Sequence, residues 1–394
     1  MPIRPCRAEI GTRALEENFR ILSALVADDV ELLAVVKADA YGHGLSLCAP
    51  AVVRAGARWL GVTSVEEGIA ARALCPDSRI LIIGGIFPGQ AEELLAHHLT
   101  AVVWDRWQIE QIETTARAMH AHAASIPVHL EIDTGMSRQG VDPTQLDEAI
   151  HWFPPSSPLR VESIMTHLYA ADEINGEITA AQFARLASVV QAVTEIGLLP
   201  EWLNVGSSAA LLSGMAKQIA RLAGRFGMKA MLRPGLALYG LAPEFNPPFN
   251  AAPPSLVSTR AQLQPVLSWK TQVTSIRNVC AGAAVGYNGT FVAAEPLTLA
   301  LLPVGYGDGL SRLLGNHFSL LIHGQMAPIC GRVSMDQTVI DVTGIEDVHP
   351  GDEVVLIGHQ GDAQITAEDH ARASHTISWE VFTRISSRVP RIPV

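Results

Sequence analysis

The sequence predicts an α/β fold in which a (β/α)8 TIM-type barrel is followed by a smaller, mostly-β domain. Over the first two thirds of the 394 residues, short aliphatic runs alternate with stretches that have apolar residues at helical spacing. After Tyr239 the β-like runs continue, but long amphipathic stretches no longer separate them. Alternating strands and helices favour a parallel sheet, and eight such units favour a closed barrel.

Eight runs are the expected barrel strands. They are ELLAVVKA (31–38), WLGVTS (59–64), ILIIGG (80–85), TAVVWD (100–105), PVHLEID (127–133), VESIMTHL (161–168), WLNVGSS (202–208) and LRPGLALYG (232–240). Helices are expected at 13–25, 107–122 and 180–196, where apolar residues recur at helical spacing. The eighth strand is the least regular, because Pro234 cannot donate a ladder hydrogen bond. An open doubly wound sheet is the alternative arrangement of these elements.

A change in composition places the domain boundary near residue 245. The segment APEFNPPFNAAPPSL (242–256) is rich in proline and asparagine and is expected to be a linker. We therefore expect the barrel over 1–245 and the mostly-β domain over 246–394. The β-like runs after the linker are SWKTQVTSIRNV, LTLALLPVGYG, HFSLLIHG, TVIDVTG and DEVVLIG, and the helical pattern that follows them is TAEDHARASHTISWEVFTRIS.

The composition argues against several classes of partner and location. A net charge of −11 disfavours nucleic acid or an anionic membrane as the main partner, since both attract basic surfaces. The five cysteines are odd in number and widely spaced, without a CxxC pair, which indicates a reduced, cytoplasmic protein; no metal site is predicted. The first residues, MPIRPCRAEIGTRALEENF, lack the apolar segment of a signal peptide, and no apolar run is long enough to span a bilayer.

Charged and polar residues gather at the expected carboxyl ends of the strands, where barrels of this type place their chemistry. They are Lys37 after the first strand, Asp133 and Arg138 after the fifth, His167 after the sixth, Ser207 and Ser208 after the seventh, and Arg233 and Gly235 in the eighth. Each has an ordinary interpretation alone: a solvated lysine, a core histidine, a helix-capping serine or a turn glycine. It is their convergence on one face that indicates a site.

This set of residues suits one cofactor. A lysine on a barrel strand can form a Schiff base with an aldehyde. Serines and glycines at helix N-termini bind phosphate through backbone N–H groups. Pyridoxal 5'-phosphate carries both groups, and the residue opposite its ring nitrogen sets how strongly the ring draws electrons. We therefore expect pyridoxal phosphate as the cofactor of the barrel.

Motifs along nearly the whole chain resemble those of the alanine racemase family. In order, they are VVKADAYGHG, IDTGMSRQGV, MTHLYAADE, RPGLALYGLAP, VGYNGTF, LPVGYGDGL, GRVSMDQTVIDV and SSRVPRI. The resemblance implies a barrel that binds pyridoxal phosphate and a β domain that contributes to the partner subunit's active site. It also implies a homodimer, with active sites at the subunit interface, that acts on a small amino acid and supplies D-alanine for peptidoglycan.

The resemblance identifies two expected bases. Lys37 matches the Schiff-base lysine, and Tyr287, in VGYNGTF, matches a tyrosine that reaches in from the other subunit. Racemisation needs such a pair, because one group removes the α-proton from one face and another returns one to the opposite face. A tyrosine with an ordinary pKa near 10 is a poor base at neutral pH. The resemblance implies that His167 and Arg233 form a network that assists it.

The resemblance also assigns the cofactor contacts. Arg233 matches the arginine that faces the pyridine nitrogen, and an arginine does not readily give up its proton, so the ring should stay unprotonated. The cofactor then draws electrons weakly, which favours returning the proton over transamination. Tyr41 and Ser208 match residues near the phosphate, together with the backbone of Gly235 and Leu236.

Four further positions are assigned to the substrate by the resemblance. Arg138 matches an arginine that contacts both the cofactor's phenolic oxygen and the substrate carboxylate. Met335 and Asp336, in SMDQT, match residues that the partner subunit contributes near that carboxylate. Tyr306, in VGYGDG, matches a tyrosine at the entrance that limits substrate size.

Three positions depart from the family pattern. Glu131 stands where some members carry a carbamylated lysine, so we expect its carboxylate to supply that negative charge and to orient Arg138, without dependence on bicarbonate. Trp379 replaces a phosphate-contacting tyrosine, and an indole N–H can donate but not accept. Ser207 replaces an asparagine. The last two changes concern cofactor affinity and leave the reaction class unaltered.

Other functions remain open alternatives. A racemase for serine or for several amino acids could use the same scaffold, because pocket size is not evident from sequence. A barrel-type decarboxylase of basic amino acids typically places a glutamate at the ring nitrogen, which Arg233 argues against. A non-catalytic cofactor-binding barrel would lack the second domain with Tyr287. A structural or interaction role would leave the convergent charged residues unexplained.

Overall fold

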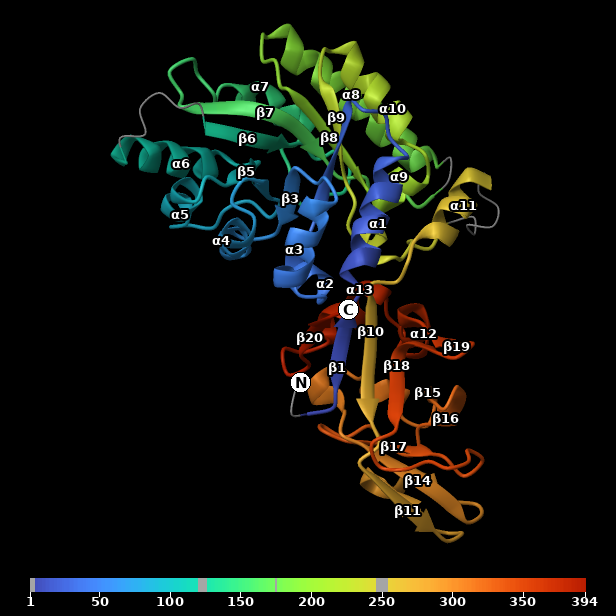
Figure 1. Ribbon diagram of the computed structural model, residues 1–394. Helices are drawn as coiled ribbons and strands as arrows, with labels where there is room; N and C mark the ends of the chain where they lie inside the picture. The colour runs from blue at the N-terminus through green and yellow to red at the C-terminus, as the bar shows by residue number, and fades with distance from the viewer. Residues whose placement is uncertain (1–3, 120–125, 174–175, 246–253) are drawn as a thin grey trace. The chain divides into compact units, whose positions relative to one another are not determined.

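The structure is a computed structural model that describes residues 4–119, 126–173, 176–245 and 254–394, and its first part is a closed barrel (Figure 1). The parallel strands are β2 (Val30–Val35), β3 (Trp59–Val62), β4 (Arg79–Ile82), β5 (Thr100–Val103), β6 (Ile126–Glu131), β7 (Leu159–Thr166), β8 (Trp202–Ser207) and β9 (Lys229–Arg233). Since β2 pairs with both β3 and β9, the barrel prediction is confirmed and the open-sheet alternative is wrong.

Burial explains why these short runs form barrel strands. Every residue of β2, β3 and β5 is buried, as expected for parallel strands covered on both faces. The predicted strands are confirmed, with small shifts at their ends. The eighth differs most, because β9 ends at Arg233, immediately before Pro234, and residues 236–239 form the short 3-10 helix η2 (Leu236–Tyr239). The missing N–H of proline gives the physical reason for this end.

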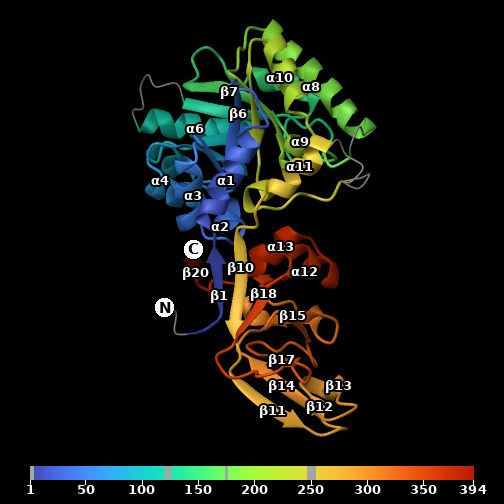
Figure 2. The ribbon, with the colours of Figure 1, turned by 45° about the vertical axis from the view of Figure 1, so that its right-hand side comes forward.

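Helices lie outside the barrel strands in both views (Figures 1 and 2). They are α1 (Thr12–Ser23), α3 (Leu45–Arg54), α4 (Val65–Leu74), α5 (Ala91–Ala96), α6 (Arg106–Ala118), α7 (Leu146–Ile150), α8 (Glu177–Glu195), α9 (Ser208–Leu212) and α10 (Ala216–Arg225). The predicted helices at 13–25 and 180–196 correspond to α1 and α8. The prediction at 107–122 overran the end of α6, and residues 120–122 lie outside the described part of the chain.

A second compact unit contains the mostly-β region. Its main sheet runs β16–β15–β18–β10–β1–β20, with β19 added beside β18, and β1, β10 and β18 lie side by side (Figure 2). The strands are β1 (Arg7–Ile10), β10 (Leu267–Gln272), β15 (Ser319–Ile322), β16 (Gln325–Pro328), β18 (Glu353–Gln360), β19 (Ala363–Ile365) and β20 (Arg391–Pro393). A smaller sheet joins β11 (Ser275–Val279), β14 (Leu297–Leu302) and β17 (Thr338–Asp341), and β12 (Ala284–Val285) pairs with β13 (Phe291–Val292).

The division into units differs from the predicted boundary. The barrel unit is Arg13–Ala40 with Cys48–Gln264, and the other unit takes Met1–Thr12, Tyr41–Leu47 and Pro265–Val394. The N-terminal segment belongs to the second unit because β1 pairs with β10 and β20. A four-residue strand such as RAEI carries too little pattern to be recognised in the sequence.

Two helical regions complete the comparison with the prediction. α11 (Pro254–Gln262) occupies the end of the expected linker, whose residues 246–253 lie outside the described part. It begins at a proline, which suits the first turn of a helix. The predicted C-terminal helical pattern forms α12 (Ala367–Ala373) and α13 (Ser378–Arg384).

All five cysteines are free, and only Cys280 among them is exposed. The longest described helices are too short or too polar to cross a bilayer, so none of the described residues forms a candidate membrane span.

Candidate active site

The structure places five predicted site residues at one end of the barrel. Lys37 comes two residues after β2, and His167 follows β7 directly. Ser207 ends β8 and Arg233 ends β9, and the two residues are paired in register. Arg138 lies in the loop after β6. The carboxyl ends of all parallel strands meet at the same end of a barrel, so these side chains surround one mouth.

A left-handed turn, α2 (Lys37–Tyr41), carries Lys37 at the end of β2. Four consecutive residues, from Ala38 to Tyr41, have φ angles between 53° and 55°. Outside glycine this conformation costs about 1–2 kcal/mol per residue, so surrounding contacts must hold the turn. Glu67 provides two of them: its carboxylate accepts hydrogen bonds of 2.7 Å from Ala38 N and from Thr63 N. This unpredicted carboxylate ties the lysine turn to the end of β3.

Burial and the charges around Lys37 lower its pKa. Burial has the largest effect, Arg138 and Arg233 lower the pKa further, and Glu67 opposes them. A larger fraction of the amine is therefore neutral than for an exposed lysine. The neutral amine is the form that attacks an aldehyde and accepts a proton.

The glycines behind Lys37 turn the chain, as predicted. Tyr41 is almost buried, and burial raises its pKa to about 12. Gly42 follows with φ of 77°, and a Cβ at this position would lie 2.3 Å from Phe382 O. Gly44 has φ of 95° and precedes α3. Gly42 is therefore required by both its conformation and its close contact.

Arg233 is buried at the barrel mouth with one donor left over. Its Nη1 donates to the backbone oxygen (2.9 Å) and the side-chain oxygen of Asn204, and its Nη2 donates to Thr166 O (2.9 Å) and His167 Nδ1 (3.2 Å). A guanidinium has five N–H groups, so these contacts occupy four. No acceptor among the described residues takes the fifth, Nε–H, although Arg233 is only 4% exposed. An unused donor on a buried arginine fits an acceptor such as a pyridine nitrogen.

The hydrogen bond from Arg233 also determines which ring nitrogen of His167 carries the proton. Because Arg233 can only donate, Nδ1 of His167 is the acceptor and the ring proton lies on Nε2. Burial, followed by the charges of Arg233, Arg138 and Lys37, lowers the pKa of His167 to about 3. The imidazole is therefore neutral near pH 7 and presents an N–H donor.

A polar chain extends from Arg233 into the barrel interior. Asn204 Nδ2 lies 3.2 Å from His129 Nδ1, and His129 Nε2 lies 3.7 Å from Glu162 Oε2. Burial would raise the pKa of Glu162, but His129 and Arg79 lower it to about 2. The chain therefore ends in a firmly ionised carboxylate that Arg79 binds through two hydrogen bonds.

The residues expected around a phosphate are brought together in part. Ser208 is the first residue of α9, and its Oγ accepts hydrogen bonds from Gly235 N (2.9 Å) and Ala237 N (3.1 Å). The N–H of Gly235 thus has a partner within the protein, and the place of its backbone near the phosphate stays a prediction. Leu236 opens η2, where first-turn N–H groups have no partner within the helix. Ser207 holds the N-cap position of α9 without a side-chain cap bond.

The described hydrogen bond of Glu131 is to Gln139. Its Oε2 accepts a 2.6 Å hydrogen bond from Gln139, and the described contacts include no hydrogen bond or ion pair between Glu131 and Arg138. Burial raises the pKa of Glu131 to about 7, although Gln139, Arg233 and Arg138 each lower it. The carboxyl is therefore only partly ionised near neutral pH. Gln139 is the bonded partner of Glu131, and the expectation that Glu131 orients Arg138 stays a prediction.

The raised pKa of Glu131 predicts a pH-dependent stability. Between its ordinary value of 4.5 and about 7, the native carboxyl holds a proton that the unfolded chain has lost. The free energy of unfolding of the cofactor-free protein should therefore fall as pH rises through this window, by up to about 3 kcal/mol. Glu131→Gln should flatten that dependence in urea unfolding at pH 5 and pH 8, whereas the exposed Glu110→Gln should not. Equal slopes for Glu131→Gln and the wild type would contradict the prediction.

The remaining predicted residues lie in the second unit. They are Tyr287 in η4 (Tyr287–Gly289), Tyr306 in η5 (Tyr306–Asp308), Met335 and Asp336 in the loop before β17, and Trp379 in α13. Tyr287 is 68% exposed, Met335 52% and Tyr306 44%. Gly307 N donates to Met335 O at 2.8 Å, so the segments carrying Tyr306 and Met335 lie side by side. Large exposed apolar side chains gathered in this way are typical of a contact surface.

Asp308, a buried carboxylate that was not predicted from the sequence, stabilises this surface. Asp308 has no exposed area, and its carboxylate binds the Arg4 guanidinium, with Nη2 at 2.7 Å from Oδ2. Arg388 Nε lies 3.6 Å from Asp308 Oδ1, and Arg388 Nη2 donates to Asp336 at 2.6 Å. Asp308 therefore fixes the turn that carries Tyr306 and links it to Asp336. Arg4 and Asp308 are too far apart in the sequence for this contact to have been predicted.

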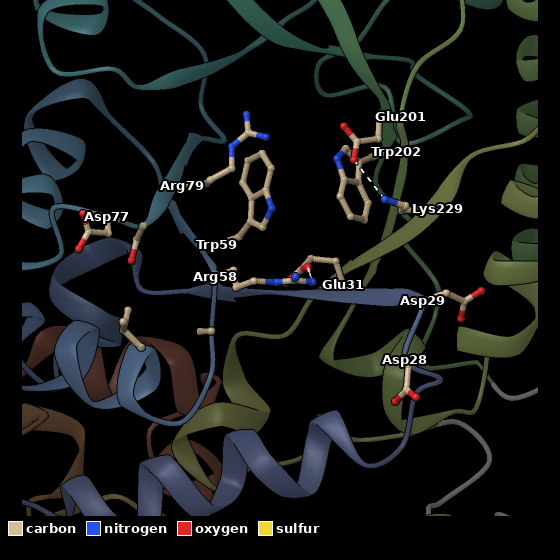
Figure 3. Close-up of a pocket in the computed structure, with 13 residues that line it drawn as sticks. Asp28, Asp29, Glu31, Arg58, Trp59, Asp77, Arg79, Glu201, Trp202 and Lys229 are labelled. Atoms are coloured by element: carbon tan, nitrogen blue, oxygen red, sulfur yellow. Dashed lines mark hydrogen bonds and ion pairs between the residues drawn. The ribbon is translucent and has the colours of Figure 1, made fainter.

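A pocket of about 680 Å³ lies at the opposite end of the barrel, where the strands begin (Figure 3). Its cations are paired: Arg58 with Glu31, Arg79 with Glu162, and Lys229 with Glu201. Arg79 also stacks 4.0 Å from the centre of the Trp59 ring, and Lys229 lies 5.3 Å from that of Trp202. Paired charges at the N-terminal end of a barrel are typical of residues that stabilise the fold rather than of catalytic residues.

The fold and the mouth together define a class. A parallel barrel with a low-pKa lysine and a buried arginine at its mouth, followed by a β unit, is the architecture of a pyridoxal-phosphate-dependent amino-acid isomerase. The family models "Alanine racemase, N-terminal domain" and "Alanine racemase, C-terminal domain" match residues 10–243 and 266–393. The chain belongs to the alanine racemase family.

Relatives match over the full length. The chain is 36% identical to the alanine racemase of Halothermothrix orenii over 392 residues, covering 98% of this chain and 96% of the relative. It is also 36% identical to that of Symbiobacterium thermophilum, covering 99% of this chain and 97% of the relative. The alanine racemase structure from Streptomyces coelicolor matches with a TM-score of 0.88 and 33% identity, over 100% of this chain and 98% of its own. The Bartonella henselae structure, which has covalently bound pyridoxal phosphate, matches with a TM-score of 0.82 and 28% identity, over 99% of both chains.

Proposed function

We propose that the protein interconverts L-alanine and D-alanine through two bases, Lys37 and Tyr287 of the partner subunit. The observation that carries this proposal is the barrel mouth, where the buried Arg233 leaves Nε–H unused beside a lysine of lowered pKa. Family membership supports the same reaction. Lys37, Arg233, Ser208 and Leu236 would hold pyridoxal phosphate, which when bound draws electrons from the α-carbon and so acidifies its proton.

Lys37 acts on one face of the α-carbon. Its lowered pKa makes the neutral amine more accessible than in an exposed lysine, so Nζ can accept the α-proton and later return one. The left-handed turn held by Glu67 fixes the direction in which the amine leaves β2. This placement lets the same amine serve both directions of the reaction.

Tyr287 of the partner subunit acts on the opposite face. The exposure of this side chain in a single chain is consistent with insertion into a second copy. The neutral His167 presents Nε2–H, which would donate to the phenolic oxygen and stabilise negative charge that develops there. That donor would assist proton transfer to and from Tyr287.

Arg138 would bind the substrate carboxylate. Its guanidinium lies close enough to Lys37 and His167 to lower the pKa of both. A guanidinium pairs with a carboxylate through two parallel hydrogen bonds, which fixes the substrate's orientation. Met335, Asp336 and Tyr306 of the partner subunit would close the pocket and limit it to small side chains. The same proposal makes the enzyme a cytoplasmic homodimer that supplies D-alanine for peptidoglycan.

Incubation of the enzyme with pyridoxal phosphate and L-alanine in heavy water tests the proposal. We expect loss of optical activity with deuterium in the D product, because each turnover exchanges the α-proton with solvent-equilibrated groups. Exchange without racemisation would mean that Lys37 works without Tyr287. Exchange with serine but not with alanine would replace alanine as the substrate. Carbon dioxide release from lysine or ornithine would identify a decarboxylase.

A further inference from the structure

A chain of buried hydroxyls connects the two loops that carry Arg138 and His167. Thr134 Oγ1 lies 2.8 Å from Thr166 Oγ1, and Thr166 Oγ1 donates to Ile132 O at 2.8 Å. Because Thr166 donates its single hydroxyl proton to Ile132 O, Thr134 must be the donor in the hydrogen bond between Thr134 and Thr166. Thr134 in turn accepts a 2.9 Å hydrogen bond from Gln182 Nε2. The donor and the acceptor of each hydrogen bond among these side chains are therefore fixed.

Gln182 links these hydroxyls to α8, and both protons of its side-chain amide are donated. Its second amide proton goes to His167 O at 3.0 Å, and its Oε1 accepts from Tyr169 N at 3.2 Å. Arg185, three residues along the same helix, donates to Thr134 O at 2.7 Å. Thr134 and Gln182 are buried, so no water competes for these bonds. One helix thus holds the loops after both β6 and β7.

The chain also reaches the buried arginine. Thr166 O accepts the 2.9 Å hydrogen bond from Arg233 Nη2, and His167 Nδ1 accepts another from the same guanidinium. A shift of Thr166 would therefore move Arg233 and His167 together. A shift of Thr134 would move the start of the loop that carries Arg138.

We propose that Thr134, Thr166 and Gln182 form a positioning unit that sets the distance of Arg138 from His167 and Arg233. This inference rests on the proposed function, in which Arg138 binds the substrate carboxylate. The hydroxyls act through their hydrogen bonds rather than through the space they fill, and none of them touches substrate. Their loss should weaken substrate binding more than turnover, because Lys37 and Tyr287 stay in place.

Two substitutions at Thr134 separate hydrogen bonding from packing. Thr134→Val keeps the volume but removes the hydroxyl, so the Gln182 donor is left unpaired in a buried place. Thr134→Ser keeps the hydroxyl but leaves a small gap. In the loaded enzyme, Thr134→Val should raise KM for L-alanine about tenfold with a smaller change in kcat. It should also raise the dissociation constant for pyridoxal phosphate, followed by absorbance titration, whereas Thr134→Ser should stay within about twofold of the wild type in both.

Control variants keep the result interpretable. Thr271→Val removes a buried hydroxyl that has no partner among the described residues, so it should leave KM and cofactor affinity unchanged. If Thr134→Val does not fold, Gln182→Met, which removes the amide and keeps the side-chain length, replaces it with the same expected result. Equal values for Thr134→Val and the wild type, or a larger defect for Thr134→Ser, would overturn the inference. Failure of the proposed function is distinct, because the wild type itself would then not racemise alanine while the cofactor titration still reports on Thr134.

Discussion

Replacing Lys37 by alanine should abolish racemisation and solvent exchange at the α-carbon, with a loss in kcat/KM of at least about a thousandfold. The amine is the only candidate on the described barrel mouth that can bind an aldehyde covalently, and burial and two arginines keep part of it neutral. The variant should also lose the visible absorbance of the bound cofactor. Stopped assays from both enantiomers, together with absorbance spectra, measure these losses.

The left-handed turn around Lys37 makes controls necessary, since any change there can alter folding. Lys229→Ala is a matched control, because Lys229 lies at the N-terminal end of the barrel, exposed, ion-paired with Glu201 and close to the Trp202 ring (Figure 3). It should keep racemase activity within about twofold, as expected for a surface ion pair. Comparable thermal unfolding of both variants would attribute the loss to chemistry. Residual kcat/KM of Lys37→Ala clearly above about a thousandth of the wild-type value would contradict the assignment.

The positions of the barrel strands could be predicted because their signal is local. Short aliphatic runs at regular spacing give the strands, and the strand ends give Lys37, Arg138, His167 and Arg233 without knowledge of any long-range contact. The same logic failed at β9, where Pro234 ended the strand earlier than its apolar run suggested. A pattern that depends on residues two to four apart is therefore sufficient for the frame of the site.

The supporting contacts could not be predicted because they join distant parts of the chain. Gln182 reaches Thr134 across 48 residues, and Arg4 reaches Asp308 across 304. A polar residue within an amphipathic helix, such as Gln182, gives no sign that it points inward rather than to solvent. The left-handed turn after Lys37 was not predicted either, because Ala38, Ala40 and Tyr41 do not indicate positive φ and Asp39 alone does not specify a run of four such residues.

The number of N–H donors needed at the barrel mouth explains why an arginine suits position 233. Arg233 donates four bonds to the protein, so in the proposed function its fifth donor, Nε–H, would bind a pyridine nitrogen without protonating it. Burial lowers its pKa to about 10, which still leaves it charged at neutral pH. His167 is neutral because burial, and then the charge of Arg233 beside it, lower its pKa. The arrangement favours brief proton transfer over chemistry that needs a strong electron sink.

The proposal that each site uses Tyr287 of the partner subunit predicts complementation between two inactive variants. Lys37→Ala and Tyr287→Phe should each racemise alanine at least about a hundredfold more slowly than the wild type, because each lacks one of the two bases. If the two are unfolded together, mixed and refolded, half of the dimers should be mixed. Each mixed dimer contains one site with both bases intact, so about a quarter of wild-type activity should return. A double variant carrying both changes is the matched control: refolded alone it should be inactive, and refolded with an equal amount of wild type its mixed dimers place one defect in each site, so only the quarter of dimers that are wild type should be active. Activity that stays at the level of the separate variants, with dimers present by light scattering, would mean that Lys37 and Tyr287 of the same chain share a site.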